Sequence, residues 1–438
     1  MASPPPGAPP LDDRERGIDP SPDVAESPEV MRERVRQRMR DGISSGMARA
    51  IDAGGSRSPE RQPVARARRA RRSRIWSFMF LLHQILGLAS GLVVAVACFT
   101  GALLVFQVEI TAAMHPARNH VQVGPTRLDV DALMDSTSRR LGGRVDAVTT
   151  YADPARPLKL VMTNGTEAYV DPYTSCIVDV QHGGERFFEV TEAIHRRLLA
   201  GEIGRRIVGI ATLCFVVILL SGIVIWWPRT LHALKAHLTF KHPTGWKRRN
   251  YDLHVVLGIY ATLILLAVGA TGLVWSFRTV GRAVDGLTPH GKATPPPPHS
   301  TPIAGRARIP VQSAINAASA ALGPTTTIAT YLPSRPRDAV TVMGLPPKAP
   351  WRQAMDVAYV DSYSGRVLRV DRFAKRPLGE LARRATNPIH VGSLYGLPSE
   401  IAAFIACLIG TIAPFTGAVI WINRKWPRAL RWPSRRSA

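Results

Sequence analysis

Four long apolar stretches constrain the fold of this chain more than any other feature. They cover residues 75–108, 207–227, 253–277 and 401–422, and each is almost free of charged side chains. An α-helix needs about 20 apolar residues to cross the hydrocarbon core of a bilayer. A water-soluble fold would have to bury four uncharged runs of that length, which is unusual. We therefore expect an integral membrane protein with four transmembrane helices.

The net charge of +24 could indicate a nucleic-acid partner, so the location of the charge matters. Basic residues gather in three places: before the first apolar run, between the second and third runs, and after the fourth. These three segments lie on one side of the membrane if every run crosses it once. Lys and Arg are enriched on the cytoplasmic side. The charge therefore indicates topology, and we expect membrane lipid rather than nucleic acid as the partner.

The domain organisation follows from this topology. The first 73 residues are basic and poor in large apolar side chains, so we expect them to be disordered. Of the four cysteines only Cys176 lies outside the apolar runs, which excludes a disulfide framework. The predicted segments are a cytoplasmic tail (1–73), a helix (75–108), an exported domain (110–205), a helix (206–228), a cytoplasmic loop (229–250), a helix (251–277), a second exported domain (278–398), a helix (399–423) and a cytoplasmic tail (424–438).

The chain also repeats itself. The residues His83, Gly87, Gly101 and Phe106 recur 171 positions later as His254, Gly258, Gly272 and Phe277. An offset of 195 relates Gly222 and Trp226 to Gly417 and Trp421, and His195 to His390. Between the helices, AYVDPYTSCIVDV resembles AYVDSYSGRVLRV. Three matches in the same order predict two parallel copies of helix, domain and helix, related by a pseudo-two-fold axis along the membrane normal.

Each exported copy has the pattern of a small α+β domain. A helical pattern over 130–141 recurs over 311–322, and each precedes segments of alternating polarity such as 158–163 and 339–343. A β-hairpin is then expected at Asp171-Pro172 and at Asp361-Ser362.

Four histidines are the candidate site residues. A pseudo-two-fold axis would bring His83 to His254 near the cytoplasmic helix ends, and His195 to His390 near the outward ends. A lone membrane histidine can simply link two helices by a hydrogen bond, and this alternative stays open. Two facing imidazoles are, however, the ligand set of a six-coordinate haem iron. Zinc or copper would need further ligands, and the chain has no C-x-x-C-H motif for covalent attachment.

Small residues near these histidines have two interpretations. Gly87, Gly91 and Gly258 could make room for a flat macrocycle, or they could allow close helix packing.

The chain resembles the PepSY-associated transmembrane-helix family, iron-regulated membrane proteins that include bacterial ferric-siderophore reductases. The resemblance covers about 75–427 and rests on LHQILGLASG with its TG partner, the V-D-x-Y-[ST] hairpins, IHRRLLAGEIGRRIVGI with SGIVIWW, DLHVVLGIY with TGLVWSF, and NPIHVGSLYGLPSE with TGAVIWI. It implies PepSY-like exported domains in a multi-pass protein of the bacterial inner membrane, and the three basic segments predict that both termini are cytoplasmic. It also implies two non-covalent bis-histidine haems b, the inner one on His83 and His254, the outer one on His195 and His390. It indicates no catalytic residues.

Some relatives carry a fused flavin and nicotinamide reductase domain, whose Gly-rich phosphate loops are absent from this sequence. The resemblance therefore implies a quinol or a separate cytoplasmic reductase as electron donor, and a periplasmic ferric siderophore as acceptor.

Three functions remain open at this point. The first is an oxidoreductase that passes electrons outward through the two haems. The second is a sensor or protease-inhibitory protein of PepSY type without redox activity, which has no use for four membrane histidines. The third is a transporter with histidines as proton relays, for which broken helices and acidic residues at the membrane midplane are expected.

Overall fold

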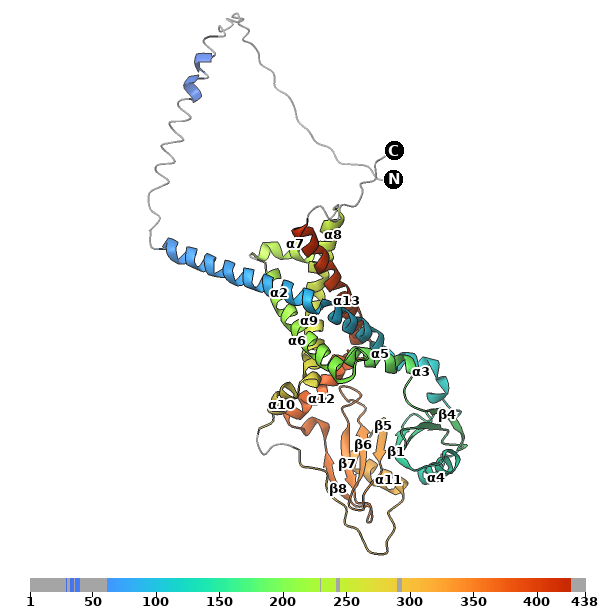
Figure 1. Ribbon diagram of the computed structural model, residues 1–438. Helices are drawn as coiled ribbons and strands as arrows, with labels where there is room; N and C mark the ends of the chain where they lie inside the picture. The colour runs from blue at the N-terminus through green and yellow to red at the C-terminus, as the bar shows by residue number, and fades with distance from the viewer. Residues whose placement is uncertain are drawn as a thin grey trace, which may run out of the picture. The chain divides into compact units, whose positions relative to one another are not determined.

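The computed structural model describes residues 29, 32–34, 36–39, 61–228, 230–241, 245–289 and 294–426 (Figure 1). The chain divides into two compact units, Met1–Arg72 and Ser73–Ala438. The second unit contains a bundle of long helices and one β-sheet.

The predicted tails lie largely outside the described residues. Within the first tail, residues 29, 32–34 and 36–39 are helical, and helix α2 (Arg61–Val105) begins before the expected end of the tail. Residues 61–73 of the predicted tail are thus part of α2. Their sequence is rich in Ala and Arg, which are strong helix formers and favour an N-terminal extension of the membrane helix. The second tail is described only as far as Trp426.

Four helical segments in the described part of the chain are long and apolar enough to cross a membrane, as predicted. They are Arg74–Val105 of α2, α6 (Gly201–Trp226), Trp246–Ser276 and α13 (Leu397–Lys425). The third comprises α8 (Trp246–Asp252), a π-helical turn η3 (Leu253–Leu257) and α9 (Gly258–Ser276). Between α6 and α8 lie η2 (Leu231–Ala233) and α7 (Leu234–Leu238).

Small side chains let the long helices approach one another closely. The centre of the bundle is formed by Ala102, Leu219, Ala261, Leu265, Ala406 and Cys407. A Cβ atom at Gly91 would lie 3.0 Å from Cβ of Pro414, and one at Gly410 would lie 2.8 Å from Sγ of Cys98. Helices α2 and α13 therefore touch where a side chain is missing, which is typical of membrane helix packing.

The regions between the helices contain the same elements in the same order. The first holds α4 (Val130–Leu141), β1 (Val145–Tyr151), β2 (Leu158–Met162), β3 (Glu167–Val170) and β4 (Ile177–Gln181). The second holds α11 (Val311–Leu322), β5 (Thr327–Tyr331), β6 (Val340–Leu345), β7 (Asp356–Val360) and β8 (Val367–Asp371). Both predicted helices are confirmed, and the predicted hairpins are β3–β4 and β7–β8.

The two sets of strands join into one antiparallel sheet of eight described strands, in the order β4-β3-β2-β1-β5-β6-β7-β8. The joint is the β1–β5 pair, in which Ala147 lies opposite Tyr331 and Tyr151 opposite Thr327. Asp131 of α4 also accepts hydrogen bonds from the backbone amides of Val311 and Gln312, at 2.7 and 2.9 Å. Pairing covers one strand edge of each half, which would otherwise be open to other chains. The sequence did not predict this fusion.

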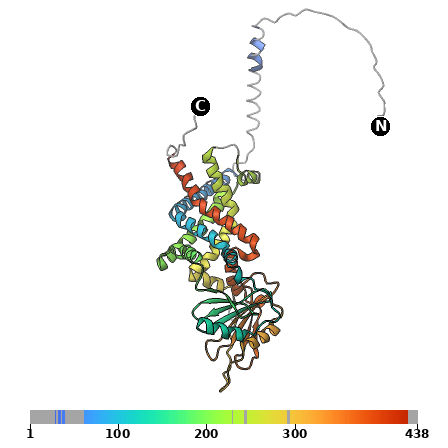
Figure 2. The same cartoon turned by 90° about the vertical axis from the view of Figure 1, so that its right-hand side faces the viewer.

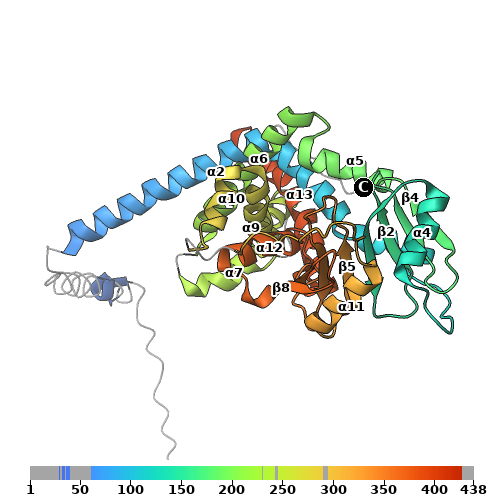
Figure 3. The same cartoon turned by 90° about the horizontal axis from the view of Figure 1, so that it is seen from below.

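Short helices connect the sheet to the bundle. On the first half they are α3 (Gln107–Met114), η1 (Pro116–Arg118) and α5 (Arg186–Arg197), and on the second α10 (Arg278–Asp285), η4 (Phe373–Lys375), α12 (Leu378–His390) and η5 (Ser393–Tyr395). Seen from below, α10 and α12 lie against α9 (Figure 3). The sheet lies at one end of the bundle, and α7, α8 and the end of α13 lie at the other (Figures 1 and 2).

Candidate functional site: two facing histidine pairs

The four candidate histidines form two facing pairs. His83 on α2 faces His254 on η3, with ring centres 6.3 Å apart and ring planes at 88°. His195 near the end of α5 faces His390 at the end of α12, with ring centres 6.2 Å apart and planes at 63°. The structure thus brings together the residues that the repeat symmetry relates. Each pair takes one ring from each half of the chain.

All four rings are held in the same way. Each Nδ1 atom lies next to a backbone carbonyl oxygen of a neighbouring helix and next to the hydroxyl of the residue three positions later. The contacts are His83 to Ile218 O (3.0 Å) and Ser221 Oγ (3.1 Å), His254 to Ala413 O (3.1 Å) and Thr416 Oγ1 (3.0 Å), His195 to Ala97 O (3.0 Å) and Thr100 Oγ1 (3.1 Å), and His390 to Val268 O (2.9 Å) and Thr271 Oγ1 (3.2 Å). A carbonyl oxygen can only accept, so each Nδ1 carries the hydrogen. Each Nε2 is therefore left as a metal-ligating atom.

A glycine follows each of these hydroxyl residues and gives the ring its space. A Cβ atom would lie 3.3 Å from Cε1 of His195 at Gly101, 3.3 Å from that of His83 at Gly222, 3.3 Å from that of His390 at Gly272, and 3.1 Å from that of His254 at Gly417. These four Ser/Thr-Gly dipeptides were not predicted as site residues. Their recurrence at the offsets of 171 and 195 is the sequence signal that could have identified them.

The distance between ring centres limits what each pair can bind. A metal–imidazole bond is about 2.0 Å long, and the ring centre lies about 1.1 Å behind the nitrogen. Two rings on opposite sides of one metal therefore have centres about 6.2 Å apart, and two rings in tetrahedral positions about 5 Å. The observed 6.3 and 6.2 Å fit the first arrangement. No cluster of three His, Cys, Asp or Glu in the described part of the chain could hold a metal ion. Two imidazoles would suffice for a metal whose other ligands come from a porphyrin.

The outer rings are in the protonation state that a ligand requires. Burial, with the neighbouring His390, lowers the pKa of His195 to about 4. Burial also lowers the pKa of His390, although the hydrogen bond to the Val268 carbonyl opposes this. Both rings are therefore neutral at pH 7, and a neutral imidazole has a lone pair for a metal.

Of the three glycines near the inner pair, one serves close helix packing and two border open space. Gly91 packs against Pro414 and serves helix packing. Among the described residues nothing lies within 4 Å of a Cβ atom at Gly87 or Gly258. Both glycines lie four residues after an inner histidine, on the same helix face as its ring. The open space is thus next to the inner pair.

One aromatic side chain distinguishes the outer pair. The ring of Trp275 lies 5.1 Å from that of His390, and its Nε1 donates to Oγ1 of Thr386 at 3.1 Å. The corresponding position of the first half, 171 residues earlier, is Leu104. The surroundings of the outer rings are therefore not symmetric.

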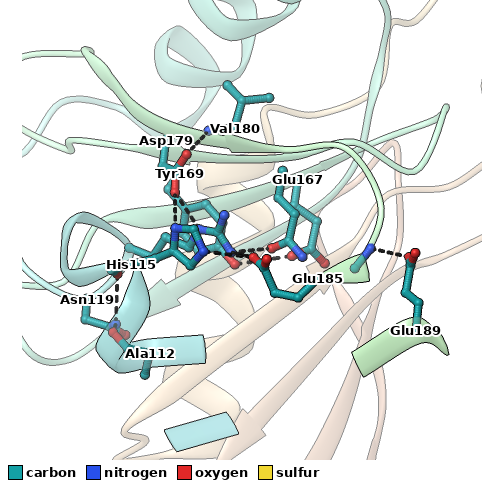
Figure 4. Close-up of polar contacts among 12 residues, drawn as sticks. Ala112, His115, Asn119, Glu167, Tyr169, Asp179, Val180, Glu185 and Glu189 are labelled. Carbon is teal, nitrogen blue, oxygen red and sulfur yellow. Dashed lines mark hydrogen bonds and ion pairs between the residues drawn. The ribbon is translucent and has the colours of Figure 1, made fainter. Parts of the chain in front are cut away.

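A polar cluster at the sheet edge fixes the start of α5, the helix that carries His195 (Figure 4). Nε2 of His115 lies 2.8 Å from Oε1 of Glu185, which immediately precedes α5. Nε of Arg118 donates to Oδ2 of Asp179 on β4 at 2.6 Å. Burial raises the pKa of Asp179, but the hydrogen bond from Arg118 and the nearby positive charge outweigh it and hold the pKa below its usual value. The sequence did not predict this cluster.

The comparison with protein families assigns the chain. The family model described as the PepSY-associated TM region matches residues 80–424. The chain belongs to this family. The match includes both histidine pairs and the sheet, and it confirms the resemblance seen in the motifs. No curated protein matches the chain.

Proposed function

We propose that this PepSY-associated membrane protein is an electron-transfer protein that reduces an acceptor outside the cytoplasm. The proposal rests on the two pairs of facing imidazole rings. In each pair the ring centres are 6.3 or 6.2 Å apart, and each Nδ1 atom is hydrogen-bonded to a neighbouring helix. A sensor or protease inhibitor without redox activity would have no use for this arrangement.

Each pair would hold one haem b without covalent attachment, His83 with His254 at the inner site and His195 with His390 at the outer site. Haem iron between two imidazoles supplies one-electron transfer. The carbonyl groups that accept from Nδ1 fix the direction of each ring and make its Nε2 more basic. The glycines of the Ser/Thr-Gly dipeptides let the rings pack against the helix backbone, and the apolar helices exclude water.

The positions of the pairs suit transfer along the bundle. The inner pair includes His254 of η3, and η3 directly follows α8 at the end of the bundle away from the sheet (Figure 1). The outer pair lies on α5 and α12, which lead from the sheet into the bundle. An electron that passes from the inner to the outer pair thus moves toward the sheet.

We further propose which compartment lies on each side of the membrane. The three basic segments favour a cytoplasmic location for both termini and for 229–250, in the bacterial inner membrane. The regions 110–205 and 278–398 would be periplasmic PepSY-like domains, and the bundle would consist of two parallel repeats. The donor would be a quinol or a separate cytoplasmic reductase. The acceptor would be a ferric siderophore, in which Fe(III) takes up one electron and the resulting Fe(II) is bound less tightly by oxygen ligands.

An optical spectrum of the purified full-length protein, with haem quantified per chain, tests the proposal. We expect two haems per chain and a low-spin spectrum that is reduced by dithionite and reoxidised by a ferric chelate. A haem-replete preparation without such a spectrum would refute the redox function, and one haem per chain would refute one of the two sites.

A further inference from the structure

A cleft beside the outer pair has the properties of a ligand site. Its volume is about 630 Å³, within the range of about 300–1,000 Å³ for small-molecule pockets. It is lined by the loop between β6 and β7, by the turn between α12 and α13, and by Glu109 of α3 and Glu400 of α13. Trp351 and Tyr395 contribute aromatic surface, and Arg352 contributes the one basic group of the lining.

Glu400 is the most informative residue in this cleft. It is only 6% exposed, no described residue forms a hydrogen bond or an ion pair with its carboxylate, and the charged groups that act on it are the like-charged Glu109 and the exposed Arg352. An unpaired carboxylate is costly to bury, so this wall of the cleft favours a positively charged occupant. Glu109 contacts Arg352 at 3.7 Å, but this arginine is 69% exposed, and exposed ion pairs contribute little. The cleft lining thus has an excess of negative charge in a chain of net charge +24.

The cleft is structurally connected to His390. Nε2 of Gln353, at the end of the β6–β7 loop, donates to Oδ1 of Asn387 at 3.2 Å, one helical turn before that histidine. On the other side, a Cβ atom at Gly392 would lie 3.5 Å from Cα of Glu400, so the turn after His390 packs directly on the start of α13. A ligand in the cleft would therefore lie next to the outer pair.

We propose that this cleft binds the electron acceptor, and that the acceptor is a metal chelate that carries a protonated amine. The carboxylates of Glu400 and Glu109 would accept hydrogen bonds from the ammonium group. The rings of Trp351 and Tyr395 would pack on the apolar body of the chelate and attract its positive end. The identity of the ligand as an acceptor rests on the proposed function, whereas the preference for a cation rests only on the cleft.

Calorimetric titration of the purified full-length protein with two gallium(III) chelates tests the proposal, because gallium(III) is not reduced under these conditions. One probe is a linear trihydroxamate complex with a free terminal amine, and the other is the same complex with that amine acetylated. We expect the acetylated probe to bind about tenfold or more weakly, the value of one charge-assisted hydrogen bond. Equal binding of the two probes, or binding of neither, would overturn the proposal.

Substitutions at the two glutamates test whether the difference in affinity between the two probes arises in the cleft. Glu400→Gln should weaken binding of the amine probe about tenfold and leave the acetylated probe unchanged, which also shows that the cleft is folded. Glu109→Gln should have a smaller effect in the same direction. Asp135→Asn, an equal loss of charge at an exposed position on α4, should change neither. If Glu400→Gln weakens both probes equally, the ammonium contact is wrong.

The two proposals can fail separately. Selective binding of the amine probe by a protein without haem would refute the electron-transfer function alone. A two-haem protein that reduces ferric chelates, and that binds both gallium probes equally, would refute the cleft proposal alone.

Discussion

The inner and outer histidine pairs share one local arrangement but are mounted on different parts of the molecule. The inner rings belong to helices that themselves span the bundle, α2 and the η3 turn before α9. The outer rings belong to α5 and α12, short helices between the sheet and the bundle. Both pairs nevertheless have Nδ1 tied to carbonyl oxygens of the long helices. The bundle therefore orients all four rings, but only the outer pair is connected to the sheet.

Replacement of a histidine should have the largest effect and tests whether the two pairs are separate sites. Loss of either axial imidazole removes one iron bond, so His83→Ala and His254→Ala should each lose the inner haem and keep the outer one. His195→Ala and His390→Ala should do the reverse. Haem per chain and the reduced spectrum measure this, with His120→Ala in an exposed loop as the control. If His83→Ala matches His195→Ala rather than His254→Ala, the pairing is wrong.

Alanine at the dipeptide glycines should weaken one pair at a time. The new Cβ atom would lie 3.3 Å from Cε1 of His83 in Gly222→Ala, and 3.3 Å from Cε1 of His195 in Gly101→Ala. The ring has to shift by a few tenths of an ångström against its hydrogen bonds. We expect about a tenfold to a hundredfold loss of haem affinity at the affected pair, as for other changes around metal ligands.

Haem transfer to apomyoglobin measures this loss, and the unaffected pair in the same molecule is the control. Equal losses at both pairs in either variant would show a general disturbance of the bundle instead of a local contact.

The polar cluster at the sheet edge should affect only the outer pair, and its effect should depend on pH. The pKa of Asp179 is lower in the folded protein, so its stabilisation is complete above the unfolded value of about 3.9 and is lost as the pH falls through the folded value. Asp179→Asn should cost about 1–3 kcal/mol at pH 7 and remove this acid dependence. Denaturant titrations that follow outer-haem release at pH 7 and below pH 4 measure the loss of stability and its dependence on pH. A loss of inner haem at the same denaturant concentration would contradict the separation of the pairs.

The smallest effect concerns the ring planes and Trp275. The angles of 88° and 63° predict that the inner pair gives the more anisotropic low-spin electron paramagnetic resonance signal. Trp275→Leu, which copies the residue at position 104, should change the outer signal because it removes the ring 5.1 Å from that of His390. The signal of the inner pair should stay constant in this variant. If the two pairs give identical signals in the unaltered protein, the predicted effect of the difference in ring-plane angle is wrong.

The sequence alone is sufficient to predict the local elements and the identity of the paired histidines. Hydropathy and length mark the four spans, and the helices at 130–141 and 311–322 match their patterns to the residue. The start of α2 at Arg61 was not predicted, because a basic composition was interpreted as disorder, although Arg and Ala also favour helix. The pairing of His83 with His254 followed from the repeat offset, because equivalent residues meet at a symmetry axis.

Contacts between distant segments were decided only by the tertiary structure. The β1–β5 pair, the contact of His195 with Thr100 and the cleft at Glu400 each join parts of the chain that no local pattern relates. Hydropathy and periodicity depend on neighbouring residues, so they specify which face of an element is buried. Which partner covers that face depends on how the helices and strands pack, and this is settled only when the whole chain folds.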